Sequence, residues 1–162
     1  MLTASAGGLL SRRVQGQGEI DSTRTEPTPT DAEIAALRLA YERWNEGDIA
    51  GVGALFTEDV EYHNSPEWPG QRVYRGASAV MTFLREEVAK TIGLSDVKIE
   101  STDVFGSQVL LSMHAQLSAF QSGDEFGRVP VFHLVQMRAG RASRVRVFLT
   151  AEEARAAALD GS

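Results

Sequence analysis

Cysteine is absent from the sequence, and histidine occurs only three times in 162 residues. The lack of cysteine excludes a disulfide framework, thiolate metal ligands and a cysteine nucleophile. The histidines, His63, His114 and His133, show no spacing of the His-Glu-x-x-His kind. Because a metal ion needs several ligands held close together, we expect no metal site, and the sequence predicts no other cofactor.

Positive charge and long apolar runs are also scarce. Lys and Arg number 16 against 22 Asp and Glu, which gives a formal net charge of -6. A polyanion partner requires clustered basic residues that displace counterions from phosphates, so we expect no nucleic-acid partner. No apolar segment approaches the roughly 20 residues of a membrane-spanning helix. We therefore expect a cytoplasmic protein without a membrane partner.

Residues 1–29 differ in composition from the rest of the chain, because they are rich in Gly, Ser, Thr, Gln and Pro. Their apolar pair, Leu9 and Leu10, is too short for the core of a signal peptide. Arg12 and Arg13 form a twin-arginine pair, but a polar segment follows them instead of an apolar one. We interpret residues 1–29 as a disordered leader and residues 30–160 as one folded domain.

Helical spacing of apolar residues dominates the first half of this domain. Thr30 and Glu33 form a capping box that opens a helix predicted over Asp31–Glu46. Asp48 is placed to cap a second, shorter helix. A third helix is predicted over Ser78–Lys90. These three helices precede most of the predicted strands.

Alternating apolar and polar residues dominate the second half. They predict one early strand around Val60 and four later strands, over residues 94–105, 109–120, 128–138 and 141–149. Gln121–Gly127 is predicted to be a polar connection, and Thr150 with Glu153 is predicted to cap a short terminal helix. This order indicates an α+β fold in which a curved, antiparallel or mixed sheet wraps three N-terminal helices.

The stretch Asp59–Gly76 concentrates polar and aromatic side chains between two predicted helices. Its first half alternates, so Tyr62 and Asn64 are expected on one face of a strand, and Glu61 with His63 on the other. A phenol and an amide on an inward face would hold a ligand. The same two side chains have structural alternatives, with the phenol bonded to a backbone carbonyl and the amide capping the turn that follows.

Three segments carry a resemblance to a known family: Trp44-Asn45-Glu46-Gly47-Asp48, Ala54-Leu55-Phe56-Thr57-Glu58-Asp59-Val60, and Phe148-Leu149-Thr150-Ala151-Glu152-Glu153-Ala154. Together with the order of elements, they resemble the SnoaL-like group of the nuclear transport factor 2-like superfamily. The resemblance implies a cone-shaped α+β fold with an apolar pocket between sheet and helices, and a homodimer formed through the outer sheet face. Its members include ketosteroid isomerases, polyketide cyclases, dehydratases and epoxide hydrolases.

Tyr62-His63-Asn64-Ser65-Pro66 is similar to the Tyr-x-Asn-x-Pro segment of limonene epoxide hydrolases, in which Tyr and Asn position the attacking water. That family also uses an Asp-Arg-Asp set, and the corresponding positions here are Ala115, Met113 and Val147. None of these three side chains can accept or donate a proton. The resemblance therefore argues against epoxide opening by that mechanism.

Ketosteroid isomerases are similar through the segment that ends at Asp59. The position of their catalytic Asp corresponds to Asn64, whose amide cannot take a proton from carbon. Their oxyanion-hole Tyr and protonated Asp correspond to Ala40 and Phe132. The acid–base groups of that reaction are thus missing.

His133 is the best remaining candidate for proton transfer, because it lies mid-strand among apolar residues where a neutral imidazole could act as a base. Both faces of this strand are apolar, so the sequence leaves open whether His133 faces the pocket or is a core or interface histidine. Tyr62 is the second candidate catalytic residue. The residues expected to line a ligand site are Trp44, Tyr62, Asn64, Trp68, Met113, Ala115, Val131, His133 and Val147.

Three functions are compatible with this pattern. The first is a binding protein for a small hydrophobic molecule that carries oxygen. The second is a cofactor-independent isomerase, cyclase or dehydratase that acts next to a carbonyl with His133 as the base. The third is a dimerising scaffold whose pocket is filled by its own side chains. A pocket of several hundred Å³ would favour a ligand, whereas a closed one below about 100 Å³ would favour the scaffold.

Overall fold

The computed structural model describes residues 26–118 and 125–161. Most of the predicted leader, the end of the 109–120 strand and residues 121–124 of the predicted connection lie outside this range. The helices are α1 (Asp31–Asn45), α2 (Ile49–Gly53), α3 (Ala77–Phe83), η1 (Leu84–Ile92) and α4 (Ala151–Asp160). The strands are β1 (Phe56–His63), β2 (Val73–Arg75), β3 (Leu94–Phe105), β4 (Gln108–Ser118), β5 (Glu125–Arg138) and β6 (Arg141–Phe148).

The predicted helix caps are present. In α1 the Thr30 hydroxyl accepts a hydrogen bond from the Glu33 amide at 3.2 Å, and the Glu33 carboxylate accepts one from the Thr30 amide at 2.7 Å. Asp48 accepts from the Gly51 amide at 2.9 Å and so begins α2. These local bonds satisfy amides that a helix N-terminus otherwise leaves without partners.

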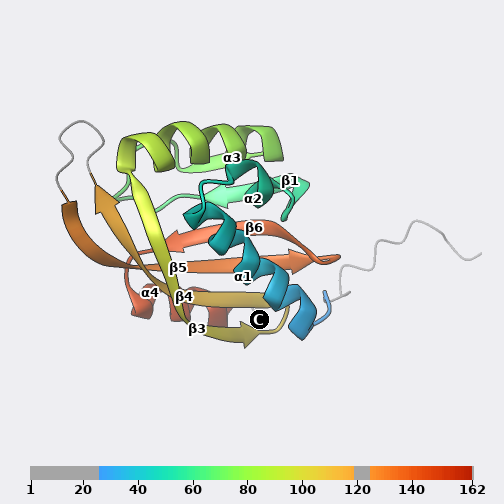
Figure 1. Cartoon of the computed structure of the whole chain (residues 1–162). Coiled ribbons are helices and arrows are strands. Elements are labelled where there is room, and N and C mark those ends of the chain that lie inside the picture. Colours follow the sequence, from blue (N-terminus) through green and yellow to red (C-terminus); the bar gives the residue numbers. More distant parts are fainter. Residues whose placement is uncertain (1–25, 119–124, 162) are drawn as a thin grey trace, which may run out of the picture.

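The six strands form one mixed, open sheet in the order β2-β1-β6-β5-β4-β3. All neighbours are antiparallel except β1 and β6, which run parallel. Figure 1 shows α1 and α2 in front of this sheet, α3 along its upper edge and α4 behind it. The α+β class expected from the sequence is confirmed, with helices on both faces of a curved sheet.

Two strand predictions are wrong in detail. The three-residue strand β2 was not predicted, because Val73–Arg75 is too short to show alternation. The predicted connection Gln121–Gly127 ends too late, since β5 already begins at Glu125 and Gly127 pairs with Leu117. Backbone pairing at a hairpin end does not require apolar side chains, so polar composition concealed this extension.

The third predicted helix is longer and partly of another type. Its first part is α3, and its second part, η1, is a π-helix that ends at Ile92 instead of Lys90. Gly93 follows with φ of +65°. A π-helix is defined by backbone bonds between residues five apart, and the apolar spacing of the sequence does not report which backbone groups pair.

Asn45, the last residue of α1, connects this helix to the sheet. Its side-chain amide donates to the Val97 carbonyl at 2.8 Å and accepts from the Val97 amide at 2.7 Å. Val97 lies where the pairing of β3 with β4 shifts register between Ser95 and Lys98. The amide of Asn45 therefore replaces strand partners at the irregularity and fixes α1 against β3.

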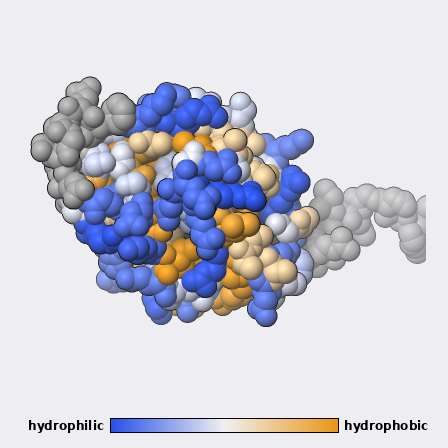
Figure 2. All heavy atoms as spheres, viewed as in Figure 1, coloured by the Kyte–Doolittle hydropathy of each residue, from blue (hydrophilic) through white to orange (hydrophobic). Residues whose placement is uncertain are grey.

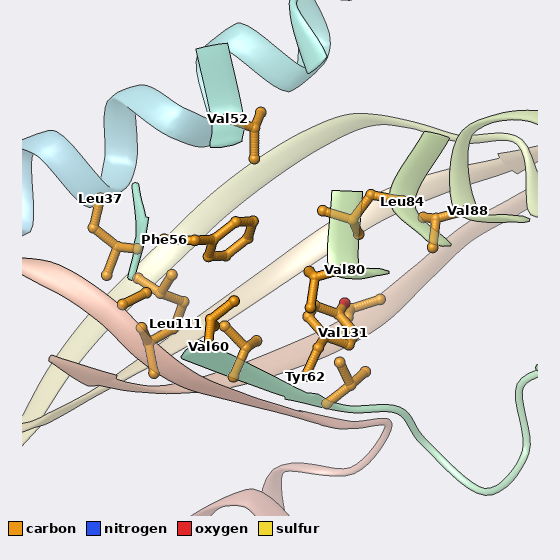
Figure 3. Packing of buried hydrophobic residues seen from close by; sticks show 14 of the residues in the cluster. Leu37, Val52, Phe56, Val60, Tyr62, Val80, Leu84, Val88, Leu111 and Val131 are labelled. Carbon is orange, nitrogen blue, oxygen red and sulfur yellow. The ribbon is translucent and has the colours of Figure 1, made fainter. Parts of the chain in front are cut away.

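The core is divided by the sheet. The larger cluster lies between the inner face and helices α1, α2, α3 and η1, and Figure 3 shows Val52, Leu84 and Val88 directed from helices toward sheet side chains. A smaller cluster on the other face joins Leu110 and Leu134 to α4. Figure 2 shows hydrophobic side chains emerging between hydrophilic ones on the α1 side. The larger cluster is the one that surrounds a cavity.

Candidate functional site

Strand β1 directs Tyr62 inward, as its alternation predicted. Val60 and Tyr62 are buried, while Glu61 and His63 lie on the opposite face. There the Glu61 carboxylate pairs with His63 at 2.9 Å and with Arg75 at 3.4 Å. The inner face packs the ring of Tyr62 5.5 Å from that of Phe83. The strand thus separates an outward ionic group from an inward phenol.

Strand β5 places His133 on the inner face, which answers the question that the sequence left open. Val131 and Val135, two residues away on either side, line the same cavity, whereas Leu134 belongs to the cluster under α4. His133 is 9% exposed and pairs across the sheet with Leu111 on one side and Val147 on the other. The imidazole is therefore set into an apolar wall.

Tyr41 of α1 completes a polar group that the sequence analysis did not identify. Its hydroxyl lies 2.7 Å from Nδ1 of His133, within hydrogen-bond distance. The ring of Tyr62 approaches the same imidazole edge-on, with centroids 6.3 Å apart. Among the described residues, no hydrogen bond to the Tyr62 hydroxyl is found. The three side chains are called the Tyr41–His133–Tyr62 group below.

Burial keeps this group uncharged. It lowers the pKa of His133 from 6.5 to about 4, so the imidazole is neutral at pH 7. Burial also raises the pKa of both Tyr62 and Tyr41. The neighbouring Tyr62 raises the pKa of Tyr41 by a further, smaller amount. No Asp, Glu, Lys or Arg is among the described residues that line the cavity. The site therefore offers neutral donors and acceptors without a fixed charge.

The cavity has a volume of about 60 Å³. Apart from the Tyr41–His133–Tyr62 group its walls are apolar or aromatic, contributed by Leu37, Ala40, Trp44, Val52, Leu55, Phe56, Trp68, Leu84, Val88, Leu94, Val97, Met113, Ala115, Val131, Val135 and Val145. The indole nitrogen of Trp44 donates to the Leu94 carbonyl at 3.1 Å. Trp44 therefore presents only its apolar surface to the interior.

The structure brings most of the predicted ligand-lining residues together. Trp44, Tyr62, Trp68, Met113, Ala115, Val131 and His133 all border the cavity. Asn64 and Val147 do not: the Asn64 amide donates to the Pro69 carbonyl at 3.0 Å and braces the loop after β1, and Val147 is buried beside His133 without bordering the space. The Asn64 side chain thus bonds within the loop after β1, while its Oδ1 has no hydrogen-bond partner among the described residues.

No group of His, Asp and Glu side chains within the described part of the chain could hold a metal ion. The same residues contain no helix with the length and apolar character needed to cross a membrane. The titratable side chains that line the cavity are Tyr41, Tyr62 and His133.

The open, curved sheet around N-terminal helices defines an α+β protein of the NTF2-like fold. Residues 37–145 match the family described as the SnoaL-like domain, which is more than half of the 162-residue chain. The chain belongs to this family, as its motifs indicated. A comparison with curated proteins found no match.

Three solved structures illustrate the shared fold. An NTF2-like protein of unknown function from Burkholderia pseudomallei K96243 is 18% identical, with 76% of this chain and 95% of that chain covered and a TM-score of 0.63. TerC, co-crystallized with polyporic acid, is 18% identical, with 78% and 98% covered and a TM-score of 0.63. An LEH-like epoxide hydrolase from M. tuberculosis is 22% identical, with 82% and 92% covered and a TM-score of 0.60. At these identities the likeness concerns the fold alone.

Proposed function

We propose that the chain binds a small, neutral, largely apolar molecule that carries oxygen, in the cavity between sheet and helices. The observation that carries the proposal is the Tyr62 hydroxyl, which is enclosed in apolar walls without a hydrogen-bond partner among the described residues. A ligand oxygen at this position would give the Tyr62 hydroxyl a hydrogen-bond partner, and such a bond contributes about 0.5–1.5 kcal/mol net.

The walls define the chemistry of the ligand. Transfer of a charged group into a cavity without counter-charges is strongly unfavourable, so an ionised ligand is excluded. Oxygen atoms of a carbonyl or hydroxyl can meet Tyr62 and the Tyr41–His133 pair, while the remaining atoms contact side chains such as Trp44 and Met113. A carbonyl compound is the simplest ligand that satisfies both requirements.

The volume limits the size of the ligand. A cavity of about 60 Å³ is smaller than the engineered cavity of ~150 Å³ that admits benzene. A ring-sized ligand therefore requires one wall to move. Trp68 lies half-buried on the loop between β1 and β2, whereas the other walls belong mainly to helices and strands. We expect this loop to move when a ring-sized ligand binds.

Family membership supports a small-molecule site. SnoaL-like and NTF2-like proteins include cyclases and isomerases, which act on small molecules. TerC, a protein of the same fold, was co-crystallized with polyporic acid. Neither comparison identifies the ligand of this chain, so the ligand class is inferred from the cavity.

The test compares two ligands of equal shape, cyclopentanone and methylenecyclopentane, which differ by the carbonyl oxygen. Binding is measured by saturation-transfer NMR and titration. We expect the ketone to bind more tightly, and Tyr62→Phe to weaken it about 2- to 12-fold, the equivalent of one net hydrogen bond. Tyr74→Phe is the matched control, because Tyr74 lies outside the cavity and its hydroxyl accepts from the Gln71 amide. Equal affinity for both ligands would contradict the role of Tyr62.

The small volume favours a second candidate function, a scaffold whose pocket is closed by its own side chains. A scaffold would bind neither probe. Absence of binding for both probes at millimolar concentration would support the scaffold and reject the ligand-binding proposal.

A further inference from the structure

We propose that Tyr41 and His133 form a proton relay that interconverts the ketone and enol forms of a neutral ligand without forming an ion. The inference rests on the proposed function and adds a reaction to it. Its basis is the 2.7 Å contact between the Tyr41 hydroxyl and Nδ1 of His133, together with the position of both side chains in the cavity wall.

The relay needs an acceptor and a donor that exchange roles through one hydrogen bond. With the proton of His133 on Nδ1, Nε2 is a free acceptor and the Tyr41 hydroxyl is a free donor. Nε2 takes the proton of the carbon next to the carbonyl. The pair of electrons of that C–H bond forms the C=C bond of the enol.

The remaining steps balance the charge. The electron pair of the C=O π bond moves to oxygen, which takes the proton of the Tyr41 hydroxyl. Tyr41 in turn takes the proton of Nδ1 from His133. The enol leaves, and the imidazole now carries its proton on Nε2, so every group is neutral before and after. The reverse transfer, or exchange with water, restores the first tautomer.

A stepwise reaction fits this cavity poorly. An imidazolium formed on His133 would lie among apolar side chains, and the described groups that face it and can titrate are Tyr41 from α1 and Tyr62 from β1. The walls from α2, η1, β3, β4 and β6 contribute no titratable side chain among the described residues. An isolated ion in such surroundings is strongly disfavoured, whereas a neutral exchange is not.

The roles of the two tyrosines then differ. Tyr41 touches both His133 and the ligand and is a catalytic residue, because it delivers a proton to the ligand oxygen. Among the described residues Tyr62 makes a ring contact but no hydrogen bond with His133, and it orients the ligand by a hydrogen bond. Loss of the Tyr41 hydroxyl should therefore lower kcat, while loss of the Tyr62 hydroxyl should mainly raise KM.

The experiment follows the replacement of the α-hydrogens of cyclopentanone by deuterium in D2O, with binding measured on the same samples. We expect the full chain to accelerate the exchange, and Tyr41→Phe to lower kcat by about 100-fold or more, as for loss of a general acid. The wild-type rate should be constant through neutral pH and fall toward pH 4. Tyr74→Phe should match the wild type.

A second variant protects the test against a purely structural effect. If Tyr41 and His133 act as one unit, the double variant Tyr41→Phe/His133→Gln should be no slower than the slower of the two single variants. Binding without exchange, or exchange that Tyr41→Phe leaves unchanged, would overturn the relay while the binding function stands. Absence of binding would overturn both.

Discussion

His133 is the residue whose environment most directly controls how the protein responds to pH. It is almost fully buried, and its one hydrogen-bond partner among the described residues is the neutral hydroxyl of Tyr41. Protonation would place a charge in the cavity, so the folded state resists it. The unfolded chain exposes the same imidazole to water.

This difference makes the free energy of unfolding depend on pH. The pKa of His133 is about 4 in the folded state, against 6.5 for an unperturbed histidine. Between these values the unfolded chain binds a proton that the folded chain does not, so stability falls as the pH drops from 6.5 toward 4. The full loss is about 3 kcal/mol.

Urea denaturation at several pH values measures this loss. His133→Gln is the control, because glutamine is polar but does not titrate. Its free energy of unfolding should vary less over this range than that of the wild type, because the contribution of His133 is removed. Some variation should remain, because the carboxylates with lowered pKa are present in both proteins. Parallel curves for the two proteins would contradict a buried neutral imidazole.

The sequence predicted two members of the Tyr41–His133–Tyr62 group and missed the third. Tyr62 followed from alternation in its strand, and His133 from being a rare titratable group in an apolar segment. Tyr41 lies within the helix predicted over Asp31–Glu46 and was not singled out, although the phenol of an inward-facing tyrosine requires a partner. That partner lies 92 positions away along the chain, so only the packing of α1 on β5 identifies it.

Among the helices, η1 is the one that departs from the common geometry. It contributes Leu84 and Val88 to the cavity, and the Thr91 hydroxyl donates to the Glu86 carbonyl five residues before it. π-helical segments are rare and are often found at functional sites. The helix ends at Ile92, and the carbonyl of the following Gly93 accepts from the Ser118 amide at 3.2 Å. This junction fixes one wall of the cavity.

Gly93 should tolerate no side chain. Its φ of +65° is unfavourable for other residues, and an added Cβ would collide with the Ser118 carbonyl. Gly47 after α1 has a similar φ of +81°, but a Cβ there would meet nothing within 4 Å. We expect Gly47→Ala to cost about 1 kcal/mol, and Gly93→Ala about 1–3 kcal/mol more, as for an overpacked site. Thermal and urea unfolding measure both, and equal losses would contradict the collision.

The elements that could be predicted are those specified by neighbouring residues. The Thr30–Glu33 capping box placed the start of α1, and Thr150 with Glu153 placed that of α4, because these contacts lie within one turn. The strand β2 is instead defined by its backbone pairing with β1, and the π-helical turn by its own backbone bonds. Local sequence carries little information about such contacts, and the structure was needed to find them.

At the scale of the whole molecule, one sheet serves two purposes. Its inner face builds the cavity with α1, α2 and η1, and its outer face holds α4 through Leu110 and Leu134. Relatives at 18% to 22% identity keep the fold. Since the fold is shared at such low identity, the side chains that line the cavity are what distinguish the chemistry of each member.

The same scale shows why the surroundings of the cavity could be predicted only in part. The sequence predicted apolar walls with a phenol and left the position of the imidazole open, and the cavity volume depends on how all the walls pack. Asn64 illustrates the difficulty: it shares the face of Tyr62, but it follows the end of β1 and turns its amide to Pro69. The alternation that holds within β1 does not apply to Asn64, which lies after the last residue of the strand. The prediction that Asn64 faces the cavity relied on that alternation.

The most direct measurement of the central claim is a crystal structure of the protein soaked with cyclopentanone. We expect the ketone between α1 and the sheet, with its oxygen within hydrogen-bond distance of the Tyr62 hydroxyl or of the Tyr41–His133 pair, and with the loop that carries Trp68 displaced. A ketone found only on the surface, or a cavity that stays closed while Tyr62 remains without a partner, would contradict the claim.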